Sequence, residues 1–310
     1  MAWRAFGGLK AVWMDGELVP WEQAKVHVTV NALHYGTAVF EGIRGYSQNE
    51  EIYVFRLRDH LKRLVESAKI VMFNNPYTVE QLQDAVIKTI RANGYRSNVY
   101  IRPIIYAGEN IMSLNARELP IRASIIVFPL EKFFDKTGLR VCVSSWRRLP
   151  DTSMPPRAKA AANYLNSILA STEAKMMGYD EALLLDHQGY VSEGAGENLF
   201  LVKNEVLATP PISSSILEGI TRDTVIKMAS DQGFRVVERQ ISRTELYTAD
   251  ELFFSGTAAE ITPIVEVDGR RIGDGAAGPV TSKLSKLYHN IVRGLEPRYK
   301  EWLTPVYGSK

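Results

Sequence analysis

The chain has 310 residues, 45% of them hydrophobic and 23% charged, and its 37 Lys and Arg against 35 Asp and Glu leave a net charge of +2. A chain of this length folds as two domains or one large one, and it buries enough apolar surface to need no disulfide or metal. The balanced charge excludes the general positive field of a nucleic-acid-binding protein, so any phosphate must be held by a few placed groups.

Cys142 is the single cysteine, which excludes an internal disulfide and any zinc site with several cysteine ligands. It lies in an apolar run and is predicted to be a small buried residue, not a nucleophile. The N-terminal residues lack the apolar core of a secretory signal, and no stretch reaches the roughly 18 apolar residues of a membrane helix. We therefore expect a cytoplasmic protein without a membrane partner and without a bound metal.

Strands and helices alternate in the first half of the chain. Asp15-Gly16 is typical of a type I′ turn and predicts a hairpin around it. Apolar residues then recur with the period of a strand or of a helix. The expected strands are residues 11–14, 17–19, 40–46, 52–55, 99–106 and 123–129, and the expected helices are residues 57–73 and 78–93. We place a small α+β domain over residues 1–130.

A polar, turn-prone segment at residues 131–138 is the predicted linker. The second domain, residues 139–310, continues the mixture of strands and helices after a proline-rich loop. Its expected strands are residues 139–145, 181–186, 190–192, 198–202, 206–209, 234–238 and 251–255, and its expected helices are residues 165–176, 221–232 and 280–294. No internal repeat is visible.

Lys159 is the candidate nucleophile. It lies among alanines just after the proline-rich loop, at the expected start of a helix, where a cation is unfavourable because the helix dipole is positive there. The small neighbours leave room for a ligand beside the amine, as a Schiff-base lysine requires. A solvated lysine at a helix start is the alternative interpretation.

Glu193 lies in a glycine-rich run, residues 192–200, between two expected strands. Because no long helix follows the glycines, a dinucleotide-binding fingerprint is a poor interpretation. Backbone without side chains lets a planar ring approach, and a carboxylate there can accept a hydrogen bond from a protonated ring nitrogen.

Two turns are typical of phosphate sites, although each alone is common in purely structural settings. Gly219 stands at the start of an expected helix, where unpaired N–H groups bind anions. Residues 255–260 form a tight polar turn after a strand. A lysine, a glycine-flanked glutamate and two such turns together match what pyridoxal phosphate needs.

Six ordered blocks resemble the branched-chain amino acid aminotransferases, which are fold-type IV pyridoxal phosphate enzymes. They include Tyr35-Gly-x-x-x-Phe-Glu-Gly and Tyr100-Ile-Arg-Pro, and together they span nearly the whole chain: residues 31–44, 100–103, 158–165, 192–200, 219–222 and 255–263. The resemblance implies a small α/β N-terminal domain with the substrate pocket and a larger pseudo-barrel domain that binds the cofactor. It also implies a homodimer as the minimum unit, with a homohexamer as an alternative.

The implied reaction is transamination of L-leucine, L-isoleucine and L-valine with 2-oxoglutarate, which gives branched-chain 2-oxo acids and L-glutamate by a ping-pong mechanism. By resemblance, Lys159 carries the cofactor as an aldimine and moves the substrate proton. Glu193 would pair with the pyridine nitrogen and Tyr164 with the phenolic oxygen. The phosphate would be bound by Arg63, Ile220, Thr221, Gly256 and Thr257.

The implied substrate contacts come from both domains. The α-carboxylate would be bound by Tyr100, Thr257 and Ala258, and an apolar side-chain pocket would be lined by Tyr35, Phe40 and Gly42. Arg102 would bind the γ-carboxylate of glutamate, a planar task that suits a guanidinium. The loop at residues 111–114 would reach the site of a neighbouring subunit.

The chain departs from many bacterial members at Leu130 and Phe133, where those carry Trp and Tyr. A lost hydroxyl there would weaken binding of a dicarboxylate and favour bulkier apolar side chains.

Several alternatives stay open. A D-amino acid aminotransferase, an (R)-amine aminotransferase or an aminodeoxychorismate lyase would share the lysine, the glutamate and the phosphate turns. The motifs at Tyr35 and Tyr100 favour the branched-chain group over these. A non-catalytic ligand-sensing protein on this fold would lack the lysine or the glutamate, and a nicotinamide oxidoreductase would need the missing glycine-rich helix unit.

Overall fold

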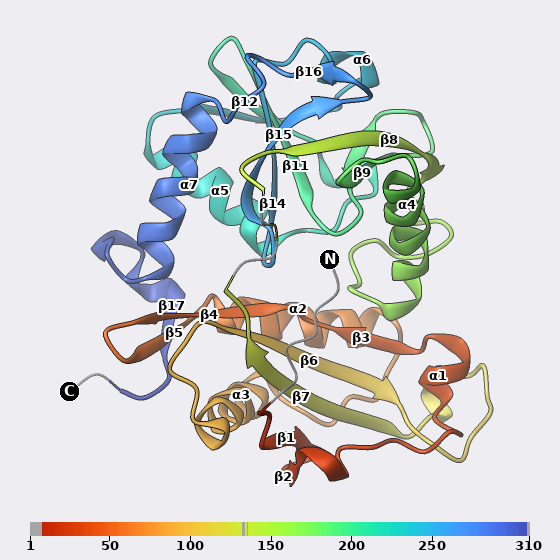
Figure 1. Ribbon diagram of the computed structural model, residues 1–310. Coiled ribbons are helices and arrows are strands. Elements are labelled where there is room, and N and C mark those ends of the chain that lie inside the picture. Colours follow the sequence, from red (N-terminus) through yellow and green to blue (C-terminus); the bar gives the residue numbers. More distant parts are fainter. Residues whose placement is uncertain (1–7, 132–133, 135, 309–310) are drawn as a thin grey trace. The chain divides into compact units, whose positions relative to one another are not determined.

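The computed structural model describes residues 8–131, 134 and 136–308, and the chain packs as two compact units (Figure 1). Unit 1 comprises Met1–Phe133, Ala158–Ala162 and Asn290–Lys310, and unit 2 comprises Phe134–Arg157 and Asn163–His289. This division differs from the predicted one, which kept residues 139–310 in a single continuous domain. Two late segments belong to unit 1 because they hydrogen-bond to its strands.

A twisted antiparallel sheet forms the centre of unit 1. In the described part of the chain its strands follow the order β17-β5-β4-β6-β7-β1-β2, and β3 also pairs with β6. The strands are β1 (Ala11–Met14), β2 (Glu17–Pro20), β3 (Ala38–Phe40), β4 (Ile43–Gln48), β5 (Glu51–Phe55), β6 (Val99–Ala107), β7 (Ile121–Pro129) and β17 (Leu303–Pro305). The predicted hairpin is confirmed, since Asp15 and Gly16 both have positive φ and β1 pairs with β2.

The predicted strand over residues 40–46 is wrong, because it is two strands interrupted at Glu41 and Gly42. Both β3 and β4 pair with β6 in one continuous register, Phe40 opposite Ile104 and Ile43 opposite Ile101. The N–H of Glu41 donates to the carbonyl of Pro103 across this gap, but a proline has no N–H to return the bond.

Two long helices pack against this sheet, α2 (Leu57–Ile70) and α3 (Val79–Asn93), and α1 (Asn31–Tyr35) is a single short turn. The Thr78 side chain accepts a hydrogen bond from the Gln81 N–H, and the Gln81 side chain accepts one from the Thr78 N–H. This capping box fixes the start of α3 where the sequence predicts it. The predicted end of α2 is three residues too late.

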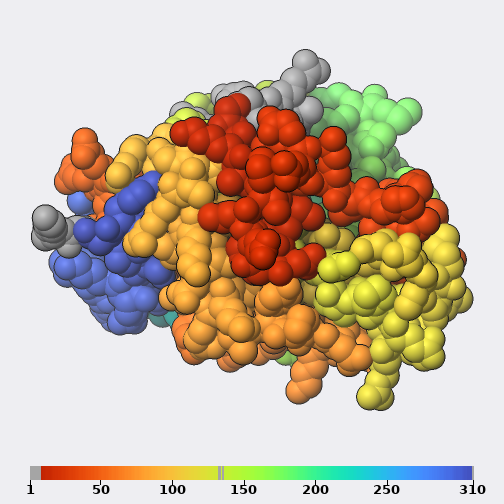
Figure 2. Space-filling model, turned by 90° about the horizontal axis from the view of Figure 1, so that it is seen from below, coloured from red at the N-terminus to blue at the C-terminus, as the bar shows by residue number. Residues whose placement is uncertain are grey.

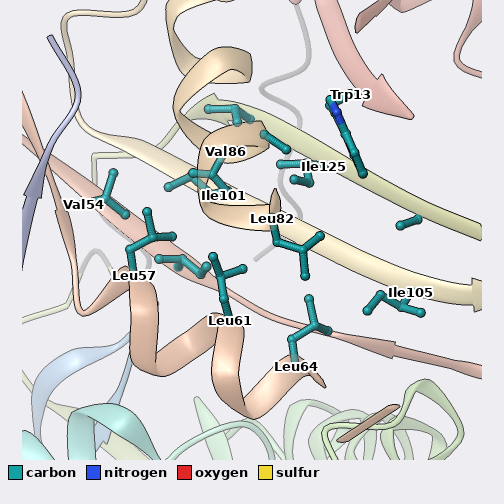
Figure 3. Packing of buried hydrophobic residues seen from close by; sticks show 14 of the residues in the cluster. Trp13, Val54, Leu57, Leu61, Leu64, Leu82, Val86, Ile101, Ile105 and Ile125 are labelled. Carbon is teal, nitrogen blue, oxygen red and sulfur yellow. The ribbon is translucent and has the colours of Figure 1, made fainter. Parts of the chain in front are cut away.

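The core of unit 1 lies between these helices and the sheet. Figure 3 shows Leu57, Leu61 and Leu64 of α2 directed toward the strands, where Ile101 and Ile105 of β6 belong to the same buried cluster. Burying one such side chain stabilises the fold by about 1.5–3 kcal/mol. The stripe that predicted α2 is therefore the face that holds it against the sheet.

The hairpin of β1 and β2 contributes to the outer surface of unit 1. Figure 2 shows it in red, beside orange residues of α3 and yellow residues that lead from β6 to β7.

The C-terminal segment completes unit 1. β17 pairs with β5 after the 3-10 turns of η5 (Pro297–Trp302). The buried Glu51 carboxylate accepts hydrogen bonds from the N–H groups of Val306 and Tyr307 at 3.0 and 2.8 Å. This segment was not predicted, because its partner lies some 250 residues earlier in the chain.

Unit 2 is built on a mixed sheet. Its strand order is β10-β9-β8-β15-β14-β11-β12-β13, with β16 on β15, among the described residues. Pairing is parallel between β8 and β9, β8 and β15, and β12 and β13, and antiparallel elsewhere. The strands are β8 (Leu139–Arg147), β9 (Glu181–Leu185), β10 (Val191–Gly194), β11 (Asn198–Lys203), β12 (Val206–Thr209), β13 (Arg235–Glu238), β14 (Glu251–Gly256), β15 (Glu260–Val267) and β16 (Arg270–Arg271).

The helices of unit 2 flank this sheet. α4 (Tyr164–Met176) packs on β8 and β9, α5 (Ile220–Asp231) packs on β13 and β14, and α6 (Arg243–Leu246) is short. α7 (Pro279–Val292) continues from unit 2 into the segment that belongs to unit 1. Cys142 is buried as predicted, and burial raises the pKa of its thiol to about 11. No helix within the described residues is long and apolar enough to cross a membrane.

Candidate active site

Lys159 lies in an extended segment of unit 1. Its N–H donates to the Ser67 hydroxyl of α2 at 3.1 Å, and its carbonyl accepts from the Phe40 N–H at 3.0 Å. The next residue, Ala160, forms a β-bridge with Val39. The prediction that Lys159 starts a helix is therefore wrong, because α4 begins only at Tyr164 and the alanines pair with β3 instead.

The Lys159 amine faces an aromatic and cationic cluster. Its Nζ lies 5.3 Å from the centroid of the Phe40 ring, and the Arg102 guanidinium carbon lies 4.6 Å from the same ring. Arg102 donates through Nη2 to the Tyr100 hydroxyl at 3.0 Å. Unit 1 thus brings together four of the residues predicted to bind substrate or cofactor.

Gly42 is part of this cluster because it lets Tyr100 approach the backbone. A Cβ placed on Gly42 would lie 2.1 Å from the Tyr100 hydroxyl oxygen and 2.9 Å from Cζ of its ring. No side chain fits there while Tyr100 keeps its position. Tyr35, by contrast, lies at the end of α1 with 45% of its side chain exposed in unit 1.

Arg63, the predicted phosphate ligand of unit 1, is paired with a carboxylate that the sequence analysis did not single out. The Glu41 Oε1 accepts from the Arg63 Nε at 2.6 Å, and the Glu41 Oε2 accepts from the Arg63 Nη2 at 2.9 Å. His60, one turn before Arg63 on α2, approaches Oε2 through its Nδ1 at 2.7 Å. Glu41 and His60 are almost completely buried.

The charges of this cluster are set by one another. Burial favours the neutral carboxyl of Glu41, but the positive charge of Arg63 and the hydrogen bonds from Arg63 and His60 prevail and hold the pKa of Glu41 well below its usual range. Burial lowers the pKa of His60 although the charge of Glu41 and its hydrogen bond act to raise it, and the charges of Arg63 and Lys159 lower it further. The cluster thus holds a carboxylate, a guanidinium and a neutral imidazole.

Glu193 in unit 2 is held on several sides at the end of β10. Its Oε1 lies 2.7 Å from Nε of Arg148, and both side chains are nearly buried. Its Oε2 accepts from the Asn198 side chain and from the Leu217 N–H, each at 3.0 Å. A nearby cation and two hydrogen-bond donors stabilise the charged form of a carboxylate, which is the form that accepts a hydrogen bond from a ring N–H.

The two predicted phosphate turns lie in unit 2 as expected. Gly219 is the residue before α5, and because it has no side chain it cannot cap the first turn of this helix. A Cβ on Gly219 would lie 2.0 Å from the Asn198 side-chain oxygen. Thr257 and Ala258 form the turn between β14 and β15, directly after Gly256.

Buried serine hydroxyls accompany these elements. Ser192 and Ser255 have 0% exposed surface, and their hydroxyls have no hydrogen-bond partner among the described residues. Ser255 lies directly opposite Asn198 in the β11–β14 ladder, so the two side chains share one face of the sheet. A buried polar atom without a partner is unusual and marks a place for a polar ligand atom. Tyr164 opens α4 in the same unit.

Sequence reasoning missed Glu41, His60, Arg148 and Asn198. A signal existed for one of them, since Glu41 is an acidic residue within a predicted strand. Arg148 gave none, because two adjacent arginines before a proline-rich loop are typical of solvent-exposed residues. Phe133, the predicted departure from related proteins, lies outside the described residues.

Comparisons with known proteins agree with these motifs. The family described as Amino-transferase class IV matches residues 38–267. A probable branched-chain-amino-acid aminotransferase of Aquifex aeolicus is 46% identical over 297 residues, which are 94% of this chain and 96% of that protein.

Solved structures agree as well. The branched-chain aminotransferase of the archaeon Thermoproteus uzoniensis, solved with norvaline, matches with a TM-score of 0.93 and 51% identity over 96% of this chain and 99% of that chain. A T.th. branched-chain amino acid aminotransferase complexed with N-(5'-phosphopyridoxyl)-L-glutamate matches with a TM-score of 0.92 and 44% identity over the same shares. The chain therefore belongs to the class IV aminotransferases, in the branched-chain-amino-acid aminotransferase family with the predicted two-domain fold of fold type IV.

Proposed function

We propose that this chain transfers the amino group of L-leucine, L-isoleucine or L-valine to 2-oxoglutarate by a ping-pong mechanism, with pyridoxal 5'-phosphate as cofactor. The observation that carries the substrate assignment is the surroundings of the Phe40 ring. The Lys159 Nζ lies 5.3 Å from the ring centroid, and the Arg102 guanidinium carbon lies 4.6 Å from it. An amine for proton transfer, a cation for a carboxylate and an apolar ring fit an amino acid with an apolar side chain. The archaeal relative solved with norvaline supports this class of substrate.

The residues of unit 2 fit the cofactor. The buried Ser255 hydroxyl without a partner among the described residues adjoins the Gly256–Thr257 turn, and Gly219 leaves the start of α5 without a side-chain cap. N–H groups at a helix start and in such a turn bind phosphate. When bound, pyridoxal phosphate supplies the electron sink for the charge that develops at the substrate α-carbon.

The proposed cofactor contacts follow the family resemblance. Lys159 binds the cofactor and moves the proton at the substrate α-carbon, and Arg63 of the same unit binds phosphate. Glu193 accepts the hydrogen bond of the pyridine N–H, and Tyr164 donates to the phenolic oxygen. The phosphate contacts of unit 2 are Ile220, Thr221, Gly256 and Thr257, whose N–H groups point at anions in such turns.

The proposed substrate contacts follow the same resemblance. Tyr100, Thr257 and Ala258 bind the α-carboxylate, and Tyr35, Phe40 and Gly42 line the side-chain pocket. Arg102 binds the second carboxylate of glutamate, since a guanidinium makes paired hydrogen bonds to a carboxylate. The T.th. relative complexed with a phosphopyridoxyl derivative of glutamate supports an acidic substrate.

We further propose that the active form is at least a homodimer. Met112 and Leu114, in the loop after β6, have 58% and 87% of their surface exposed. Exposed apolar side chains this large are typical of a surface that another subunit covers. Light scattering after gel filtration measures the mass, and a monomer at enzymatic concentrations contradicts this part of the proposal.

An absorption spectrum and a donor series test the function. We expect the purified protein to show a visible cofactor band that shifts with L-leucine and is unchanged by D-leucine. Glutamate should appear when L-leucine and 2-oxoglutarate are supplied together, with parallel double-reciprocal lines. A response to D-leucine alone would favour the D-amino acid alternative, and a colourless protein that binds no added pyridoxal phosphate contradicts the proposal.

A further inference from the structure

We propose that Glu41 and His60 are positioning residues that hold the Arg63 guanidinium in the orientation in which it binds the cofactor phosphate. The inference rests on the proposed function, because it explains how Arg63, one of the proposed phosphate ligands, is held in place. It concerns two residues that lie beside the cluster of Phe40, Gly42 and Tyr100 but are not themselves placed in contact with substrate.

The Glu41 carboxylate takes one edge of the guanidinium. Its two oxygens accept from Nε and Nη2 of Arg63 at 2.6 and 2.9 Å, which is the paired geometry of a planar fork. A guanidinium has five N–H bonds, and the remaining three point away from the edge that a carboxylate occupies in this way. Glu41 therefore sets which edge of Arg63 is directed at an anion.

The carboxylate is itself fixed from other sides. The Nδ1 of His60 donates to Oε2 at 2.7 Å, and the Gly42 N–H donates to the same oxygen at 3.3 Å. Burial lowers the pKa of His60 despite the opposing effect of Glu41, and a neutral imidazole can donate through its Nδ1–H without adding a charge. With its partners on several sides, Glu41 has one orientation available.

The face of α2 that carries His60 and Arg63 also contacts the main chain of the reactive lysine. His60, Arg63 and Ser67 follow one another at helical spacing, and the Ser67 hydroxyl accepts the Lys159 N–H at 3.1 Å. One rigid helix thus sets the positions of the phosphate ligand and of the lysine backbone together. Supporting contacts of this kind keep a binding group within a fraction of an ångström of its working position.

A purely structural role is the competing explanation. Removing one partner of a buried ion pair destabilises a protein in either case, so a loss of stability does not separate the two roles. A positioning role instead predicts an effect that depends on the phosphate of the ligand.

The test compares two ligands that differ only by that phosphate. The apoprotein is titrated with pyridoxal 5'-phosphate and with pyridoxal, and the ratio of the two dissociation constants is measured. The variants are Glu41→Gln, Arg63→Gln, the double variant, and Glu51→Gln as control. Glu51 is matched because it is a buried carboxylate of the same unit, but the donors to it are main-chain N–H groups of Ile52, Val306 and Tyr307 and not Arg63.

We expect Glu41→Gln to raise the dissociation constant of pyridoxal 5'-phosphate about tenfold, as loss of a supporting partner does in other binding sites. The dissociation constant of pyridoxal should be unchanged. Arg63→Gln should likewise raise the ratio of the dissociation constant of pyridoxal 5'-phosphate to that of pyridoxal. The double variant should raise it no further than Arg63→Gln does, and Glu51→Gln should keep the wild-type ratio. A Glu41→Gln protein that binds both ligands as wild type does, or loses both equally, overturns the inference. So does a double variant with additive losses.

If Glu41→Gln does not fold, His60→Ala carries the same test, with rescue expected in His60→Asn because its amide restores a donor to Glu41. An unchanged ratio in His60→Ala then overturns the inference. Failure of the proposed function has a different signature, because the wild-type protein would then bind neither ligand or would bind both equally well.

Discussion

The Nε of Arg148 lies 2.7 Å from Oε1 of Glu193, and 8% and 5% of the two side chains are exposed. The pair is thus a buried counter-ion contact behind the carboxylate that we assign to the pyridine nitrogen. Removing one partner of such a pair leaves an uncompensated buried charge.

Arg148→Met should therefore destabilise the protein and lower turnover. We expect a loss of about 3 kcal/mol in the free energy of unfolding, because Glu193 would keep its charge without its cation. Urea denaturation measures this loss. Arg140→Met is the control, since Arg140 pairs with Glu266 at the surface and its loss should have a much smaller effect. Equal losses in the two variants would contradict the assignment.

Lys159→Ala should abolish transamination and keep the fold. The contacts that anchor this residue to β3 and α2 run through its main chain, so they persist without the side chain. We expect turnover to fall by more than about 10⁴-fold, because the amine both binds the cofactor and transfers the proton. Turnover and thermal midpoint are measured beside Lys227→Ala, an exposed lysine of α5. Substantial residual turnover would exclude Lys159 as the catalytic lysine.

Gly42→Ala should raise KM for amino acids by displacing Tyr100. The new Cβ would lie 2.1 Å from the Tyr100 hydroxyl, and overpacking of this kind costs about 1–3 kcal/mol. Gly42→Ala combined with Tyr100→Phe should relieve part of the clash and recover thermal stability. Gly45→Ala is the control, because the Cβ that it would add meets Ile52 and Val99, at 2.7 and 2.8 Å, and not Tyr100. A normal KM in Gly42→Ala would show that Tyr100 is free to move without consequence.

Acidification should destabilise the protein through His60 first. An unfolded histidine binds a proton as the pH falls below about 6.5, whereas burial lowers the pKa of folded His60. The unfolded state then binds more protons than the folded state. The free energy of unfolding therefore decreases as the pH decreases, by at most about 1.4 kcal/mol per pH unit. Glu41, with a lowered pKa, adds a further loss only below its ordinary value of 4.5.

The measurement is the urea midpoint between pH 7.5 and 5.5 in wild type, His60→Asn and the exposed control His187→Asn. The decline should be shallower in His60→Asn only. Identical slopes in all three proteins would assign the acid sensitivity elsewhere.

Phe133→Tyr should improve the use of glutamate more than that of leucine. The prediction rests on the family resemblance, which implies a tyrosine at this position in many bacterial members and a hydroxyl that a dicarboxylate could engage. The quantity to follow is the ratio of kcat/KM for the two donors. A ratio that stays constant, with Phe133→Leu as a comparison, would show that this position does not select the substrate.

Local signals predicted much of this molecule. The helix that begins after Thr78 and the hairpin at Asp15 follow from capping and turn chemistry within a few residues. The turns at Gly219 and Gly256 lie at a helix start and a strand end, as their motifs predict.

What failed depends on partners distant in sequence. The break at Glu41 arises because the residue opposite is Pro103, and nothing near residue 41 reveals that pairing. The extended conformation at Lys159 is set by β3, more than a hundred residues earlier. The contacts of Glu193 with Arg148 and of Glu41 with Arg63 likewise join residues from different elements, so only the folded sheet discloses them.

The pairing of β17 with β5 has a consequence for biosynthesis. During translation β5 leaves the ribosome long before residues 303–307 are synthesised. Until then the Glu51 carboxylate lacks the hydrogen bonds that the N–H groups of Val306 and Tyr307 donate to it. Unit 1 is thus begun before unit 2 and completed after it, so a chain that stops before residue 303 lacks the strand that pairs with β5.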